Sequence, residues 1–206
     1  MRSFLCLNCG EVYNESVENK DGIVGNALGV YAYMCPKMNC NGHVIEIDDF
    51  LLSVIRNLNK MGFSTLSCCS GHSYDSLVQN SNHVRTYILF ERACRGLPLD
   101  DEMLGEIEAG LPEGFELSTD NVDAMDRFII SRSLSLNSES ECIRAIGMNC
   151  ADLLEWTENV LPLFIEKYED EFEEYFYDFI ESLREQGEII GELDGEDMDS
   201  PSRVVY

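Results

Sequence analysis

The sequence CLNCG at residues 6–10, answered by CPKMNC at residues 35–40, decides the fold of the N-terminal region. Two residues separate Cys6 from Cys9, and Gly10 can adopt the positive φ that a tight turn around a metal needs. Cys35 and Cys40 form a second pair on another turn, with four residues between them. The 25 residues between the pairs suffice for a hairpin. Four thiolates can therefore meet at tetrahedral corners, each about 2.3 Å from one ion.

This spacing predicts a structural Zn²⁺ site whose ligands are Cys6, Cys9, Cys35 and Cys40. Four protein ligands leave no open coordination position, which argues against zinc catalysis there. Three alternatives stay open from the residues: iron in a rubredoxin-like site, His43 in place of Cys40, or four unrelated small buried residues. Two spaced pairs, each on a turn, favour the metal.

Working outward, the chain reads as an α+β protein: an N-terminal zinc ribbon joined to a small α/β unit, with acidic C-terminal helices. We expect the ribbon over residues 1–47 and the α/β core over residues 48–150. Acidic amphipathic helices should cover residues 151–190, and residues 191–206 read as a flexible acidic tail.

Caps and periodicity locate the elements of the core. Asp48 is a good N-cap for a helix of apolar residues at helical spacing that ends at Gly62. Ser138 with Glu141 forms a capping box for a helix beginning near Glu139. The other expected elements are an acidic helix closed by Gly110, strands at 63–69, 84–91, 114–118 and 127–134, and one long helix from Pro162 to about Gln186.

The charge is extreme and uneven. The net charge is −25, and residues 151–199 carry eighteen acids and only two bases. Such a field repels nucleic-acid phosphates and anionic membranes, so we do not expect direct binding to nucleic acid. It would attract a protein partner with a basic surface. No targeting signal or membrane-length apolar run is seen, and nine cysteines suit a reducing compartment, so we expect a cytoplasmic protein.

The helix after Pro162 has two interpretations. Its aromatic residues advance by three and four, which is typical of an amphipathic helix lying on a core with a solvated acidic back. The alternative is a projecting helix that binds a partner. The candidate partner-binding residues are Tyr168, Phe172, Tyr175, Phe176 and Phe179.

The stretch FSTLSCCSGH at residues 63–72 offers a weaker site. Cys68 and Cys69 end a strand and point to opposite faces, and a sharp turn at Gly71 brings His72 next. A structural turn is the main interpretation. The alternatives are a catalytic Cys69–His72 pair acting on a small molecule or RNA, and a second metal site that adds His83 and Cys94 to Cys69 and His72.

The order CLNCG, CPKMNC, LNKMGFSTLSCCSGH, YILFE, LPEGFEL and LLEWTENVLP resembles a family of uncharacterised zinc-ribbon proteins of Firmicutes and their phages, over about residues 1–163. The resemblance implies a phage or mobile-element origin, with the host cytoplasm as the compartment. Residues 63–72 are also similar to a segment of the wybutosine-synthesis tRNA methyltransferases, with His72 in the place of an arginine. We expect a non-enzymatic, zinc-binding protein that binds and modulates a host protein, one that itself holds nucleic acid.

Overall fold

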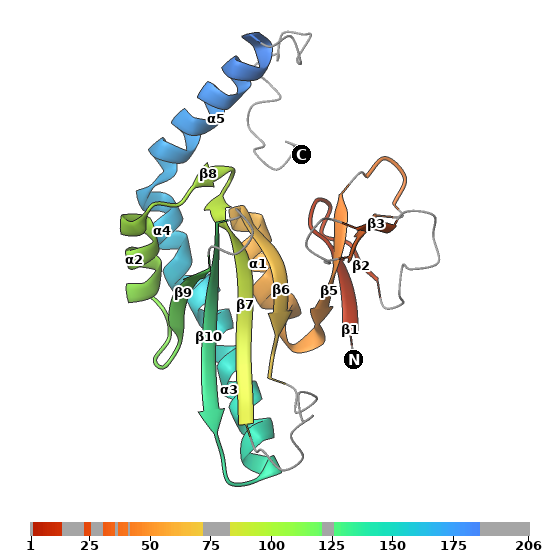
Figure 1. Cartoon of the computed structure of the whole chain (residues 1–206), viewed down its shortest axis with the longest axis vertical. Coiled ribbons are helices and arrows are strands. Elements are labelled where there is room, and N and C mark those ends of the chain that lie inside the picture. Colours follow the sequence, from red (N-terminus) through yellow and green to blue (C-terminus); the bar gives the residue numbers. More distant parts are fainter. Residues whose placement is uncertain are drawn as a thin grey trace.

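The computed structural model describes residues 2–13, 23–25, 31–35, 37–40, 42–71, 83–120 and 126–185. These residues form an α+β fold with two antiparallel sheets, as the sequence predicts (Figure 1). The N-terminal sheet lies beside α1 (Leu52–Met61) and β6 (Phe63–Cys69), and the second sheet carries its helices on one face. The predicted tail over residues 191–206 lies outside the described residues.

The first sheet contains the two cysteine turns. Its strand order is β2-β1-β5-β4-β3, and β1 and β5 pair along their length, from Arg2 opposite Asp48 to Cys6 opposite Val44. One cysteine turn connects β1 to β2 and the other connects β4 to β5. The strands are β1 (Arg2–Cys6), β2 (Val12–Tyr13), β3 (Ile23–Gly25), β4 (Tyr31–Met34) and β5 (His43–Asp48).

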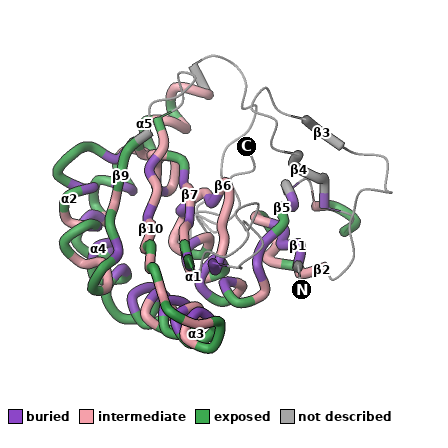
Figure 2. The backbone as a smooth tube through the Cα atoms, turned by 60° about the horizontal axis from the view of Figure 1, so that its bottom comes forward, coloured by how far each residue is buried: buried purple, intermediate pink, exposed green. Residues whose placement is uncertain are grey.

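The second sheet has the order β6-β7-β10-β9, with β8 paired to β7. The strands expected at 63–69 and 84–91 form β6 and β7, which pair antiparallel with Cys69 opposite Tyr87. Buried and more exposed residues alternate along β7 and β10, so one face of this sheet packs against helices (Figure 2). The strands are β6 (Phe63–Cys69), β7 (His83–Cys94), β8 (Leu97–Pro98), β9 (Glu116–Asp120) and β10 (Arg127–Ser135).

The predicted helix caps are confirmed. The Asp48 carboxylate accepts from the backbone N–H of Phe50, and Gly62 closes α1 at φ 96°. Ser138 caps α3 by accepting from the Glu141 N–H, at 3.3 Å. The helices are a 3₁₀ turn (Asp49–Leu51), α1 (Leu52–Met61), α2 (Asp101–Ala109), α3 (Glu139–Glu155), a π-helical turn (Trp156–Val160), α4 (Leu161–Lys167) and α5 (Glu169–Glu185).

The helix expected from Pro162 to Gln186 is two helices, because the chain breaks at Tyr168. Tyr168 adopts φ −106° and ψ 18° and packs against Phe164, with ring centroids 4.9 Å apart. The break turns Phe172 into the core, where its side chain is 2% exposed. Beyond Phe172, α5 extends away from the body of the molecule (Figure 1).

One large core joins the regions that the sequence divided. Leu5 and Ile47 of the first sheet, Phe90 and Phe128 of the second, and Leu153 of α3 all belong to it. Helix α3 runs across the expected boundary at residue 150, and buried residues continue as far as Phe172. The residues between 151 and 172 therefore contribute to the main core.

Candidate metal centre

The structure brings the sulfur atoms of the four predicted ligands close together. The Sγ atoms of Cys6, Cys9, Cys35 and Cys40 all lie within 4.8 Å of one another. Cys6 Sγ is 3.7 Å from Cys40 Sγ, and Cys9 Sγ is 3.7 Å from Cys35 Sγ. Four sulfurs at about 2.3 Å from a central ion stand about 3.8 Å apart when the tetrahedron is regular. Two of the six sulfur pairs thus already have the separation that one tetrahedral metal ion requires, and the other four lie within 4.8 Å.

The backbone of both turns is shaped around the sulfurs. Gly10 sits at φ 68° and its N–H donates to the Cys6 carbonyl oxygen at 3.0 Å, which closes the first turn. Asn39 takes the same conformation at φ 66° in the second turn, just before Cys40. The Cys9 N–H lies 3.5 Å from Cys6 Sγ and donates to it. Donation of this kind stabilises the charge of a metal-bound thiolate.

Polar side chains next to the sulfurs add to this support. The Tyr13 hydroxyl lies 3.1 Å from Cys35 Sγ. Burial and this hydrogen bond raise the pKa of Tyr13, so the phenol stays protonated and can donate to Cys35 Sγ when that sulfur is a metal-bound thiolate. The Asn8 amide nitrogen lies 3.8 Å from Cys40 Sγ. These groups are the outer partners that orient metal ligands in known sites.

Simultaneous deprotonation of the four thiols is unfavourable without a cation. Burial raises the pKa of both Cys6 and Cys9 above the ordinary value. Burial also acts to raise the pKa of Cys40, but hydrogen bonds from the Gly42 backbone and from the other thiols outweigh it, and that pKa is lowered. Four adjacent thiolates repel one another, and a divalent cation offsets that repulsion. The donor set therefore fits a metal ion.

Gly42 lets the two turns approach. A Cβ atom at this position would lie 2.4 Å from Asn8 Cβ and 2.7 Å from Cys6 Sγ. Only glycine fits this contact without displacing the first cysteine turn. Arg56 of α1 donates to the Gly10 carbonyl oxygen at 3.0 Å, which ties the same turn to the main core. The centre is thus positioned from both sides.

The weaker candidate site at the end of β6 is described only as far as Gly71. The Gly71 N–H donates to Cys69 Sγ at 3.4 Å, and Gly71 adopts φ 104° against Val84. His72 lies outside the described residues, so a Cys69–His72 pair stays a prediction. Burial raises the pKa of the neighbouring Cys68 thiol to about 12, which leaves it protonated and unreactive near neutral pH.

The suggested second metal site does not form from His83 and Cys94. These residues are the first and last of β7, twelve residues long, so they stand roughly 37 Å apart along the strand. His83 Nδ1 instead lies 3.5 Å from the Ser135 hydroxyl, and Cys94 Sγ donates to the Met61 carbonyl oxygen at 3.4 Å. In the described part of the chain, the four N-terminal cysteines are the one group able to hold a metal.

The proposed partner-binding aromatics divide into two sets. Tyr168 and Phe172 are buried in the main core, so they attach the helix to the body. Tyr175, Phe176 and Phe179 are half-buried on the part of α5 that extends away. Partner binding by the second set stays a prediction.

Sequence reasoning missed a buried polar chain where the two sheets meet. The Asp48 carboxylate accepts from the Ser70 N–H at 3.0 Å, and also from its hydroxyl. Thr86 donates to the Ser70 carbonyl oxygen at 2.8 Å, and the Asn149 amide nitrogen donates to Thr86 Oγ1 at 2.8 Å. Asn149 occupies a core-facing position of α3 between apolar neighbours. A polar residue at such a position is the sequence signal that could have revealed these buried hydrogen bonds.

No family model, curated protein or solved structure matches this sequence. The site therefore rests on its own geometry. In the described part of the chain, each helix is too short or too polar to cross a membrane.

Proposed function

We propose that the four cysteines hold one structural Zn²⁺ and that the chain is a non-enzymatic protein that binds a basic surface of a host protein through α5. Zinc is favoured over iron because a closed set of four thiolates on two turns is typical of structural zinc sites. The centre fixes the first sheet and has no open position for a substrate. The resemblance of residues 1–163 to phage and Firmicutes proteins supports a bacterial partner.

The observation that carries the binding function is the projecting half of α5. The helix has eight acids and one base in seventeen residues. Among the described residues, Phe172 is the last aromatic side chain of α5 that belongs to the main core. Beyond that point Tyr175, Phe176 and Phe179 stay half-exposed among exposed acids such as Glu174 and Asp178. Aromatic anchors within an acidic rim are suited to a basic partner, with the charge increasing the association rate.

The partner that fits this surface is a protein that itself binds nucleic acid. Such a protein carries a patch of lysine and arginine that neutralises phosphates. The acids of α5 offer a competing ligand for that patch. Binding should therefore weaken steeply with salt, and duplex DNA should displace the chain from its partner.

Two truncations of the zinc-loaded chain test this proposal in pull-downs from bacterial lysate. Ending the chain after Glu174 removes the projecting half of α5 but keeps Phe172 in the core. We expect this variant to lose the captured protein, and a chain ending after Glu185 to keep it. The captured protein should be released by moderate salt and by added duplex DNA. Capture by the chain that ends after Glu174 would contradict the proposal. Capture that added duplex DNA does not reverse would contradict it as well.

Charge reversal separates a specific surface from overall acidity. Lysine at both Glu174 and Asp178 changes the net charge as much as lysine at Glu102 and Glu108, which are exposed on α2. We expect the first pair to abolish capture and the second pair to preserve it. Equal effects would mean that net charge alone drives the association.

Zinc content by elemental analysis should be one ion per chain in all variants, and iron in its place would overturn the metal assignment.

A further inference from the structure

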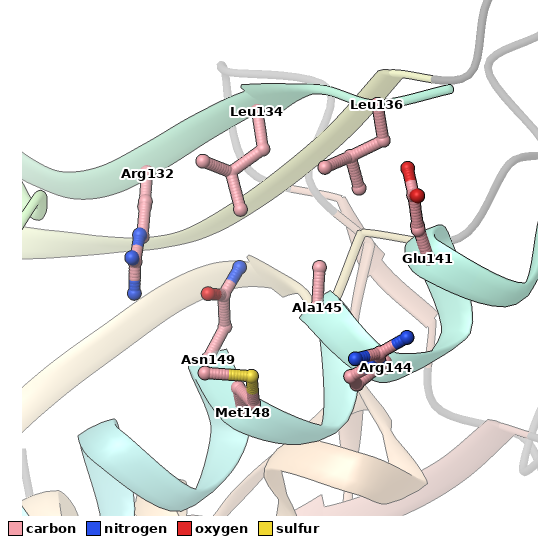
Figure 3. Close-up of a pocket in the computed structure, with 8 residues that line it drawn as sticks. All are labelled: Arg132, Leu134, Leu136, Glu141, Arg144, Ala145, Met148 and Asn149. Carbon is pink, nitrogen blue, oxygen red and sulfur yellow. The ribbon is translucent and has the colours of Figure 1, made fainter. Parts of the chain in front are cut away.

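Helix α3 (Glu139–Glu155) packs against the second sheet with one side and presents the opposite side to solvent (Figure 2). Its buried side chains are Cys142, Ala145, Asn149, Cys150 and Leu153. Figure 3 shows two of them, Ala145 and Asn149, directed toward β10, whereas Arg144 and Met148 lie along the flank of the helix. The outer side of α3 is therefore accessible to another molecule.

Apolar residues are concentrated on this outer side. Ile143 is 66% exposed and Met148 is 55% exposed. Gly147 and Ala151 are exposed on the same side, and open space surrounds Gly147. The half-buried Leu134 lies across a groove from Met148, so the apolar surface continues onto β10. A contiguous apolar surface marks an interaction site, whereas single exposed apolar residues do not.

Two charged residues stand at the ends of this surface. Arg144 and Glu155 are eleven residues apart, which is three turns of helix, so they lie on the same face. Both are exposed, and neither forms an ion pair with another residue that the structure describes. The exposed residues of α3 from Ile143 to Glu155 thus carry one positive and one negative charge, in a chain whose net charge is −25.

This pattern is complementary to itself. When a two-fold axis relates two antiparallel helices, residue i of one copy meets residue j of the other, and j meets i. An axis that passes between residues 149 and 150 places Arg144 opposite Glu155 of the second copy, and does so twice. Gly147 and Ala151 then flank the crossing point, where small side chains let two helices approach closely. A parallel pair would instead place Arg144 against the same arginine of the second copy.

We propose that α3 forms the interface of a symmetric homodimer, in which its outer side packs antiparallel against the same side of a second copy. Two Arg144–Glu155 pairs fix the register, and Ile143 and Met148 supply apolar contact on either side of the crossing point. The helix is about 26 Å long, and one helix face buries less than the standard interface area. We therefore expect a dissociation constant on the order of 10–100 µM. The interface uses neither the cysteine centre nor α5, so it does not rest on the function proposed above.

The test is sedimentation equilibrium of the full-length, zinc-loaded chain from about 5 to 500 µM. Salt at about 0.15 M screens charges farther apart than about 8 Å, which limits the repulsion between two strongly acidic chains but spares close ion pairs. We expect a monomer–dimer equilibrium without larger species, because a two-fold interface is closed. A chain that stays monomeric at the highest concentration, or that forms larger assemblies, would overturn the proposal.

Charge exchange identifies the residues at the interface. Arg144→Glu and Glu155→Arg each place like charges at both contacts, so each variant alone should dimerise roughly tenfold more weakly or worse. An equimolar mixture of the two variants should dimerise about as well as the natural chain, because each contact then joins an acid to a base. The doubly exchanged chain, Arg144→Glu with Glu155→Arg, should also dimerise on its own for the same reason.

Glu108→Arg is the matched control, because Glu108 is exposed on α2 and the change alters the net charge as much as Glu155→Arg does. This variant should dimerise like the natural chain. Unchanged zinc content and thermal midpoint in dilute solution show that each variant is folded. Equal effects of Glu108→Arg and Glu155→Arg would overturn the proposal. A mixture of the two exchanged variants that stays monomeric would overturn it too.

Discussion

The cysteine centre and the main core stabilise this chain by different means. Among the side chains that the structure describes, the small core at the centre has four buried hydrophobic residues, Phe4, Cys6, Cys35 and Val44, whereas the main core has twenty-six. Four residues bury too little apolar area to offset the entropy of ordering five short strands. We therefore expect the first sheet to depend on a bound metal ion, and the second sheet and its helices to depend on apolar burial.

The two regions nevertheless share strands. On β1, Phe4 and Cys6 face the cysteine centre, while Leu5 faces the main core. On β5, Val44 and Ile45 divide in the same way. The alternation of a strand thus makes each of these elements a wall of both cores. Loss of the metal should release the first sheet without unfolding the second, and this contrast can be tested.

The largest expected effect is that of Cys35→Ser. One lost thiolate opens the tetrahedron, and apparent folding free energies of structural zinc sites are about 10–16 kcal/mol. We expect no bound metal and loss of hydrogen-exchange protection over β1, β4 and β5, with protection of β7 and β10 retained. The matched variant Cys142→Ser removes a buried thiol from α3 and should keep one ion per chain. Metal retained by Cys35→Ser would show that the contrast is wrong.

Phe172→Ala tests the opposite side of the comparison. Its side chain is 2% exposed and lies beneath the Arg95 guanidinium, 5.6 Å from the ring centroid. Truncation of a buried phenylalanine costs about 3–5 kcal/mol. Denaturant titration should show that loss while metal content stays at one ion. Phe179→Ala, on the projecting half of α5, should cost much less. Similar losses would mean that the distal helix is as well packed as its base.

Gly42→Ala should be the next largest effect. Its new methyl group would meet Asn8 and Cys6 at 2.4 and 2.7 Å, and overpacking of this kind costs about 1–3 kcal/mol. Metal affinity should fall with stability, as measured by competition with a chelator. Gly147→Ala is the control because open space surrounds that helical position, and it should stabilise the chain by a few tenths to about 1 kcal/mol. A neutral Gly42→Ala would contradict the close approach of the two turns.

The parts of this structure that were predictable are those encoded by local chemistry. Three predicted features depend on a few neighbouring residues, and the structure has each of them. They are the turn that joins Cys6 to Cys9, the helix N-cap at Asp48 and the end of that helix at Gly62. The break at Tyr168 was missed because the helical pattern continues through it, and tertiary packing decides where the chain turns.

The buried polar chain was missed for the same reason. Its members, Asp48, Ser70, Thr86 and Asn149, are far apart in sequence and come together only when both sheets and α3 assemble. Asp48 illustrates the limit well, since its role as a helix cap was predictable and its contact with Ser70 was not. Local sequence patterns thus predict where helices and strands begin and end. They do not predict hydrogen bonds between residues that are far apart in the sequence.

Alkaline pH should weaken the main core by a smaller amount. Burial raises the pKa of Cys94 to about 12 from an ordinary 9.0. The neutral thiol therefore contributes stability that is fully present below pH 9 and is lost as the pH rises from 9 to 12. At pH 10 the loss should be on the order of 1 kcal/mol for this residue. Cys94→Ala should show a flatter decline in unfolding free energy over that interval, and an identical slope would exclude this cause.

Tyr13→Phe should have the smallest effect on the stability of the main core, and it sharpens the comparison most. The change removes only the hydroxyl that donates to Cys35 Sγ at 3.1 Å and leaves the ring in the small core. Loss of such an outer partner typically costs 10–100-fold in metal affinity, because the thiolate charge is less well stabilised. Competition with a chromophoric chelator should detect this loss, while the unfolding free energy of the second sheet and its helices changes by no more than about 1 kcal/mol. Tyr87→Phe, whose hydroxyl lies 3.5 Å from Ser67 on the second sheet, should leave metal affinity unchanged. If Tyr13→Phe also has no effect on affinity, the ring supports the first sheet by packing alone, and the two cores differ less than their chemistry implies.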